Sequence, residues 1–274
     1  MAKVIGIFGD THGRSDMLEA LHKKIKDLHG DIPLYSCGDL VDRGPDSAGV
    51  IQYCIDNGIE AVVGNHDDWL RRLCVNMQFD SFALAPVMGG THTALSYGAT
   101  SATGFQRGAS TADIAEEIYQ MVPQDHKDWL KDLPFYRKVV LDSGEVYWIL
   151  HAGLTNPAAN SFLSVSSNDD ELMLHFLKYR RTMDLLIWAR PRYPHTNSLG
   201  EVNRPGYKED DLYQFRDGAT QVFGHSIRTD AIVRDHYVAL DTGCGTRSLG
   251  KLTAIIMPSR EIVTIEENDV VDWV

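Results

Sequence analysis

The chain has 274 residues, 43% of them hydrophobic and 23% charged, a composition that excludes a disordered or fibrous protein. Its formal net charge of −12 disfavours non-specific binding to nucleic acid, which is itself a polyanion. No apolar run approaches the roughly 18 residues of a membrane span, and the N-terminus has no signal-type apolar segment, so we expect a cytoplasmic protein without membrane partners.

Short apolar runs alternate with helical patterns in the first third of the chain. Residues 4–8, 34–37 and 60–63 have the length and apolar character of buried strands. Apolar residues at helical spacing separate them, and Gly30 and Gly58 follow the two helical patterns as stop signals. This order predicts β-α-β-α-β units and a largely parallel sheet.

The rest of the chain predicts further strands and two lobes. Residues from about 67 to 138 and from about 155 to 217 favour helical or irregular structure. Strands are predicted at 146–150, 220–223, 237–240, 252–257 and 261–265. Because no repeat and no linker separates two cores, we predict one α/β domain over residues 1–274, with two sheets in a sandwich flanked by helices.

Five of the predicted strands run directly into loops that carry glycine and a polar side chain able to bind a metal. Ligands of α/β sheets bind beyond the carboxyl ends of the strands, so these loops are expected to converge. Carboxylate, imidazole and amide groups without thiolates suit Mn²⁺, Fe or Zn²⁺ at a hydrolytic centre. The candidate ligands are Asp10, His12, Asp39, Asn65, His151 and His225.

Six ligands are too many for one open catalytic metal, but they suit two metals that share Asp39. Two ions about 3.5–4 Å apart can hold a hydroxide between them and clamp an in-line displacement at phosphorus. The residues therefore predict a dinuclear centre for phosphoester hydrolysis.

Three segments resemble the fingerprints of the phosphoprotein phosphatase (PPP) family of metallophosphoesterases. They are Gly-Asp-Thr-His-Gly at 9–13, Gly-Asp-Leu-Val-Asp-Arg-Gly at 38–44 and Gly-Asn-His-Asp at 64–67. The segments 89–98, 184–190 and 240–243 are similar to bacterial and phage members, so the resemblance covers nearly the whole chain. It implies a metallophosphoesterase fold and two divalent ions, with Mn²⁺ expected first and Fe or Zn²⁺ as alternatives.

The resemblance also implies a role for each matching residue. Asp10 and His12 would bind the first ion, Asp39 would bridge, and Asn65, His151 and His225 would bind the second.

Four further residues would act on the substrate. The resemblance makes His66 the general acid that protonates the leaving alkoxide, and makes Asp42 the carboxylate that holds its imidazole. Arg43 and Arg190 would hold the phosphate oxygens, with Arg192 as an alternative to Arg190.

Two substrates are compatible with these features. One is a phosphorylated protein or peptide, cleaved by a serine/threonine phosphatase. The other is a dinucleoside tetraphosphate, because the symmetrical diadenosine tetraphosphatases are similar in Gly-Asn-His-Asp and in Leu-Asp-Thr-Gly-Cys. That relative typically carries Ala at the position of Asp42, and its nucleotide leaving group needs less protonation, so we favour the protein phosphatase.

Three other functions fit the sequence less well. Cys37 and Arg43 match the Cys-x₅-Arg spacing of cysteine-dependent phosphatases, but Asp39 and Asp42 within that loop would disfavour a thiolate. A non-catalytic binding module would be expected to have lost ligands, and all six are present. A nuclease is disfavoured by the acidic composition and by Arg43.

Overall fold

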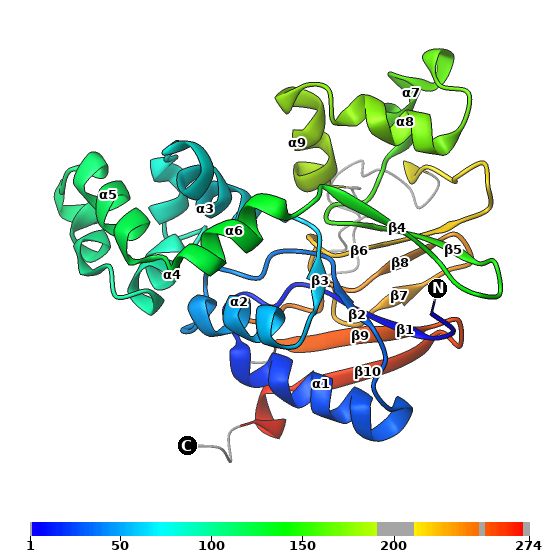
Figure 1. The fold of residues 1–274 in the computed structure, drawn as a ribbon, viewed down its shortest axis with the longest axis horizontal. Helices are drawn as coiled ribbons and strands as arrows, with labels where there is room; N and C mark the ends of the chain where they lie inside the picture. The colour runs from blue at the N-terminus through cyan, green and yellow to red at the C-terminus, as the bar shows by residue number, and fades with distance from the viewer. Residues whose placement is uncertain (1, 191–210, 247–249, 271–274) are drawn as a thin grey trace, which may run out of the picture.

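The computed structural model describes residues 2–190, 211–246 and 250–270. Within them, two five-stranded sheets lie against each other, with helices on their outer sides (Figure 1). Both sheets are mixed, and the chain forms one α/β domain, which confirms the predicted fold class.

The first sheet has the order β10-β9-β1-β2-β3. Strands β1, β2 and β3 are parallel, while β9 and β10 form an antiparallel hairpin paired with β1. The bounds are β1 Ile5–Phe8, β2 Leu34–Ser36, β3 Glu60–Ala61, β9 Lys251–Met257 and β10 Glu261–Glu266.

The second sheet has the order β4-β5-β6-β8-β7. Its three middle strands are parallel, and an antiparallel strand lies at each edge. The bounds are β4 Tyr136–Val140, β5 Val146–Leu150, β6 Thr220–Phe223, β7 Ile232–Val233 and β8 Tyr237–Ala239.

The side chains of one strand alternate between the layer where the two sheets meet and the layer beneath the helices. Ile5 and Ile7 of β1 join Ile149 of β5 in a cluster that both sheets share. Phe8 and Trp148, on the opposite faces, pack in the larger cluster against helices. Since successive side chains of a strand point to opposite faces, strands buried on both sides read as continuous apolar runs.

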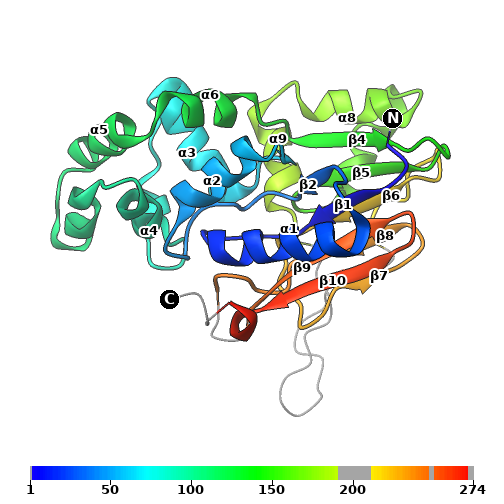
Figure 2. The ribbon, with the colours of Figure 1, turned by 60° about the horizontal axis from the view of Figure 1, so that its bottom comes forward.

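Two helices connect the parallel strands of the first sheet. Helix α1 (Ser15–His29) lies along β9 and β10, as Figure 2 shows, and contacts α2 (Ser47–Asp56). The face of α1 that carries Leu18, Leu21 and Ile25 is buried. The spacing of these residues fits one side of a helix with 3.6 residues per turn.

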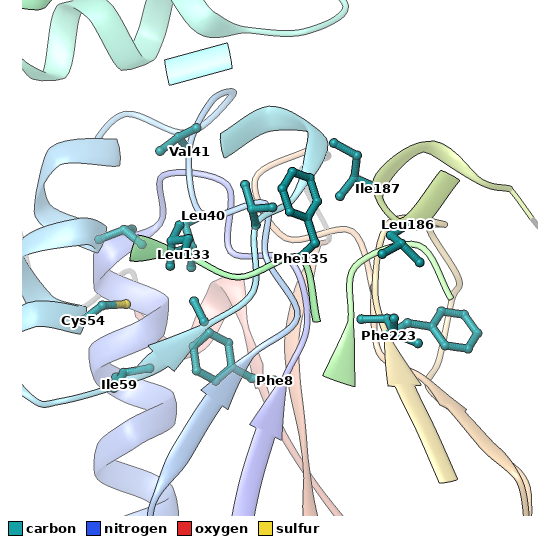
Figure 3. Packing of buried hydrophobic residues seen from close by; sticks show 14 of the residues in the cluster. Phe8, Leu40, Val41, Cys54, Ile59, Leu133, Phe135, Leu186, Ile187 and Phe223 are labelled. Carbon is teal, nitrogen blue, oxygen red and sulfur yellow. The ribbon is translucent and has the colours of Figure 1, made fainter. Parts of the chain in front are cut away.

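The remaining helices form two groups (Figure 1). One follows β3 and contains α3 (Asn65–Asn76), α4 (Gly90–Ser96), α5 (Thr111–Met121), α6 (Gln124–Asp132) and two 3-10 helices (Ser81–Leu84, Thr100–Arg107). The other follows β5 and contains α7 (Asn156–Asn160), α8 (Asp169–Phe176) and α9 (Arg180–Trp188). Phe8, Leu40, Leu186 and Phe223 belong to one continuous apolar cluster that reaches both sheets and α9 (Figure 3).

All eight predicted strands are present. Strands β4 and β7 were not predicted, and β4 corrects the expectation that residues 136–138 belong to a helical lobe. Part of the second predicted lobe, residues 191–210, lies outside the described residues. Among the helices of the described ranges, none combines the length and the apolar character of a membrane span.

Candidate metal centre

The carboxyl ends of the parallel strands in both sheets lead into one group of polar side chains. Asp10 follows β1, Asp39 follows β2, and Asn65 begins α3 directly after the loop from β3. From the second sheet, His151 follows β5 and His225 follows β6. All five are buried, although each comes from a different loop.

Asp39 lies at the centre of this group. Its Oδ2 is 3.7 Å from His12 Nε2 and 3.9 Å from His66 Nε2. Its Oδ1 is 3.2 Å from His151 Nε2 and accepts a 2.9 Å hydrogen bond from the backbone N–H of His66. Asp39 therefore faces imidazoles on both sides, as a ligand shared by two cations would.

The remaining predicted ligands surround this carboxylate. His151 Nε2 lies 3.0 Å from Asn65 Oδ1 and 3.1 Å from His225 Nδ1. Asp10 accepts the backbone N–H of His225 at 3.0 Å, and its Oδ2 is 3.9 Å from His12 Nε2. The structure thus brings together all six candidate ligands from positions 10 to 225.

Backbone carbonyls orient two of the imidazoles. His12 Nδ1 lies 2.9 Å from the carbonyl oxygen of Val41, and His151 Nδ1 lies 2.8 Å from that of Cys37. An imidazole that donates from Nδ1 to a carbonyl presents the lone pair of Nε2, which is how metal-binding histidines are usually held. Nε2 of His225 is buried and has no hydrogen-bond partner among the residues that the structure describes.

The donor set fits divalent cations. Two groups, His12–Asp39–His66 and Asp39–His151–His225, each bring three ligand atoms within 4.8 Å of one another. Buried imidazole lone pairs and carboxylates crowded in this way would leave acceptors unsatisfied without a cation.

The pKa directions agree with this interpretation. Burial, together with the Asp241 and Asp39 carboxylates, raises the pKa of Asp10 well above its ordinary value. Burial and the neighbouring imidazoles lower the pKa values of His12 and His225, so both rings are neutral, the form that binds metals. Burial opposes ionisation of Asp39, but His151 and the other histidines lower its pKa well below its ordinary value.

Backbone strain is concentrated at the same place. Seven non-glycine residues of the described ranges have a positive φ, and five of them belong to this group: His12 (45°), Asp39 (53°), Asp42 (73°), Arg43 (67°) and His225 (65°). Such conformations cost of order 1–3 kcal/mol each and persist where the surrounding structure imposes them.

His66 and Asp42 form a hydrogen-bonded pair beside the ligands. His66 Nδ1 is 2.7 Å from Asp42 Oδ2, and both side chains are buried. Arg43 lies over the imidazoles: its Nη2 is 2.9 Å from His66 Nε2, and its Nη1 contacts His12 Nε2. An imidazole, its carboxylate partner and a guanidinium therefore meet at one edge of the centre.

Arg190 is exposed, and its positive charge contributes to lowering the pKa of His225, after burial and the charge of His151. Arg192, the alternative, lies outside the described residues. The rival mechanism through Cys37 is not supported, because burial and Asp10 raise the pKa of this fully buried thiol well above its ordinary value.

Sequence reasoning missed the residues that hold the loops in place. Asp67 accepts the backbone N–H groups of Gly64, Asp39, Leu40 and Val41. Its place in the third fingerprint was visible, but nothing in the spacing indicated which backbone groups it would bind.

A further carboxylate, that of Asp241, lies close enough to Asp10 to act on its charge. Asp241 is buried, contributes to the raised pKa of Asp10, and accepts the backbone N–H of Gly243 at 3.0 Å. This hydrogen bond is of the kind that a turn requires.

Comparison with known families decides the classification. Residues 3–189 match the family described as calcineurin-like phosphoesterase. The chain belongs to the calcineurin-like phosphoesterase family. It is therefore a hydrolase of a family that uses divalent metals, in agreement with the fingerprints and with the geometry of the centre.

Curated relatives extend over nearly the whole of this phosphoesterase. A protein of Neisseria gonorrhoeae named bis(5'-nucleosyl)-tetraphosphatase, symmetrical, is 25% identical, with 97% of this chain and 96% of the relative covered. A protein of the same name from Delftia acidovorans is 26% identical, with 86% of each chain covered.

Solved structures show the same fold. A proposed diadenosine tetraphosphatase has a TM-score of 0.57 at 21% identity, with 97% of this chain and 94% of that chain covered. A serine/threonine phosphatase from Saccharomyces cerevisiae has a TM-score of 0.50 at 15% identity, with 96% and 79% covered.

Proposed function

We propose that this phosphoesterase hydrolyses phosphomonoesters of serine and threonine in proteins or peptides. The observation that carries the proposal is the buried pair of His66 and Asp42, joined by a 2.7 Å hydrogen bond at the edge of the metal-binding group. An alkoxide leaves phosphorus poorly, so its ester needs a proton donor that an acidic leaving group does not need.

Asp10, His12, Asp39, Asn65, His151 and His225 would hold two divalent cations, with Asp39 between them. When bound, such ions act as Lewis acids on the phosphoryl group and make water a better nucleophile at neutral pH. Mn²⁺ is the expected ion, and Fe or Zn²⁺ would suit the same carboxylate, imidazole and amide ligands.

Other side chains would supply the proton and bind the phosphoryl group. His66 would give its Nε2 proton to the leaving oxygen, while Asp42 holds Nδ1 and stabilises the charged imidazole. Arg43 lies against His66 and would bind phosphoryl oxygens next to the proton donor. Arg190, exposed beside His225, would bind the other side of the phosphoryl group.

Two cavities flank Arg43 and offer room for the rest of the substrate. One, of about 340 Å³, is lined by Arg14 and Glu267 as well as Arg43. The other, of about 400 Å³, is lined by Pro86, Val87, Gly89, His92, Ile227, Gly245 and Thr246 together with Arg43. Pro86, Val87 and Ile227 make part of the lining of the second cavity apolar, so an apolar side chain next to the phosphorylated residue would fit it.

A second candidate function is symmetrical cleavage of dinucleoside tetraphosphates. It is supported by the names of the curated relatives, which align over most of their length. The Asp42–His66 pair argues against it, because a nucleotide leaves readily without a proton.

A substrate panel with Mn²⁺ separates the two functions. We expect hydrolysis of a phosphoserine peptide to exceed that of diadenosine tetraphosphate, and cleavage of the dinucleotide alone would refute the proposal. The variant His66→Asn should lower turnover of the peptide by roughly 10²–10⁴-fold and that of 4-nitrophenyl phosphate much less. Metal content, measured on the same sample, should stay unchanged. An equal loss on both substrates would contradict the proton-donor role.

A further inference from the structure

The segment 89–98 is similar to bacterial and phage relatives, but it contains no candidate metal ligand and no candidate proton donor. In the structure its helix, α4, packs against the Asp42–Arg43 loop. The carbonyl oxygen of Gly89 accepts the backbone N–H of Arg43 at 3.3 Å. A Cβ on Gly90 would lie 2.5 Å from the carbonyl oxygen of Ala83 and 3.3 Å from the indole ring of Trp69, so small residues let α4 approach Arg43, Ala83 and Trp69.

Thr93 reaches Asp42 from this helix. Its Oγ1 donates a 2.7 Å hydrogen bond to Asp42 Oδ1 and accepts the backbone N–H of Asp42 at 2.8 Å. A third contact, at 2.9 Å, joins it to the hydroxyl of Ser47, which also accepts the Asp42 N–H. Thr93 is fully buried, and these contacts use the single proton and both lone pairs of its hydroxyl.

The two oxygens of Asp42 have different principal partners. Oδ2 lies 2.7 Å from His66 Nδ1 and accepts the indole N–H of Trp69 at 3.0 Å. Oδ1 is the acceptor for Thr93 at 2.7 Å and lies farther from the same indole nitrogen, at 3.3 Å. With Oδ1 occupied, the carboxylate cannot rotate about its Cβ–Cγ bond without breaking a buried hydrogen bond. Its Oδ2 is therefore fixed towards the imidazole.

We propose that Thr93 is a positioning residue for proton transfer, which orients Asp42 and through it the His66 imidazole. The inference rests on the proposed function, because a fixed imidazole matters only when the leaving group needs a proton. It explains why the Gly-Gly-x-x-Thr segment lies beside the site without touching the metal ligands: Gly89 and Gly90 allow the approach, and Thr93 makes the contact.

The variant Thr93→Val tests the inference, since valine keeps the shape of threonine but has no hydroxyl. Turnover of a phosphoserine peptide should fall about 10-fold, as expected for loss of a buried hydrogen bond to a charged group. Turnover of 4-nitrophenyl phosphate, whose leaving group needs no proton, should change less than about 3-fold. Thr93→Ser should restore the peptide activity, because it restores the hydroxyl.

Thr91→Val, on the same helix, is the matched control and should leave both activities unchanged. An equal fall on both substrates for Thr93→Val would show a merely structural role and overturn the inference. So would unchanged peptide turnover.

Thermal unfolding of each variant reports whether it folds. If Thr93→Val does not unfold cooperatively, Ser47→Ala takes its place, since it withdraws one hydroxyl from the same network. It should show a smaller loss confined to the peptide, and an unselective or absent loss would reject the inference. If the wild-type protein hydrolyses only the dinucleotide, the proposed function itself is refuted. This result is measured on the wild-type protein, so it is distinct from any result with the variants.

Discussion

Gly89 offers a quantitative test of how closely α4 is fitted to Arg43. Its φ is +85°, and a Cβ there would lie 2.7 Å from the backbone nitrogen of Arg43 and 2.9 Å from its Cα. In Gly89→Ala, the left-handed backbone costs roughly 1–2 kcal/mol. The loss of unfolded-state freedom returns about 0.4–1 kcal/mol. Overpacking against Arg43 adds about 1–3 kcal/mol, so we expect a net loss of roughly 1–5 kcal/mol.

Gly108 provides the matched control. Its φ is +83°, and nothing lies within 4 Å of the position that a Cβ would take. Gly108→Ala therefore carries the same backbone cost without the contact, and should lose only about 1 kcal/mol. The difference between the two variants in the free energy of unfolding, measured by urea denaturation, isolates the contact with Arg43.

The catalytic efficiencies of Gly89→Ala and Gly108→Ala should differ as well. Relief of the contact in Gly89→Ala moves Arg43, and a displacement of about 1 Å at a substrate-positioning group can cost roughly 10²-fold. We expect kcat/KM for the phosphoserine peptide to fall in Gly89→Ala and to stay at the wild-type value in Gly108→Ala. If both variants have the same stability within about 0.5 kcal/mol and the same kcat/KM, then α4 does not constrain Arg43 as argued.

Three further predictions concern other parts of the chain. Asp39→Asn should lose both metal ions in elemental analysis, because a neutral amide bridges two dications poorly, and full occupancy would contradict the shared ligand. Val87→Asp should raise KM for a phosphopeptide with an apolar residue next to the phosphorylated one, but not KM for 4-nitrophenyl phosphate. Val165→Asp, at an exposed position, is the control, and equal changes of KM in the two variants would exclude the cavity as a binding site. Arg180→Ala removes a bidentate partner, at 2.8 and 2.6 Å, from buried Asp68. It should lower the free energy of unfolding by only about 0.5–1 kcal/mol, because Arg180 is partly exposed and Arg72 stays 3.0 Å from Asp68; an unchanged denaturation midpoint would show that the pair contributes nothing.

Most of the strands that sequence could predict are buried on both faces, and β10, which is partly exposed, is the exception. Residues of β1, β5 and β6 are almost all buried and read as continuous apolar runs. Strand β4 lies at a sheet edge, is partly exposed along its length and carries Arg137 and Lys138, so its pattern did not stand out. Strand β7 has two residues, too few for any periodicity.

The residues of the candidate site also differ in whether the sequence could indicate them. The candidate metal ligands directly follow predicted strands, so residue type and position were sufficient to indicate them, whereas the roles of His66 and Asp42 were indicated by the family resemblance. Trp69 and Thr93 lie 27 and 51 residues from Asp42 in the sequence. Their contacts arise only when the helical lobe packs on the loop, and an isolated tryptophan or threonine carries no signal of such a partner.

The left-handed residues of the centre have a consequence for attempts to make this enzyme more robust. Glycine at His12, Asp42 or Arg43 would relax the main chain, and a screen that rewards heat tolerance alone should therefore collect replacements there. Each of them would remove a side chain to which the proposed function gives a role. Screening for thermal tolerance and for turnover together would avoid such losses, and safer targets lie on surfaces remote from these turns.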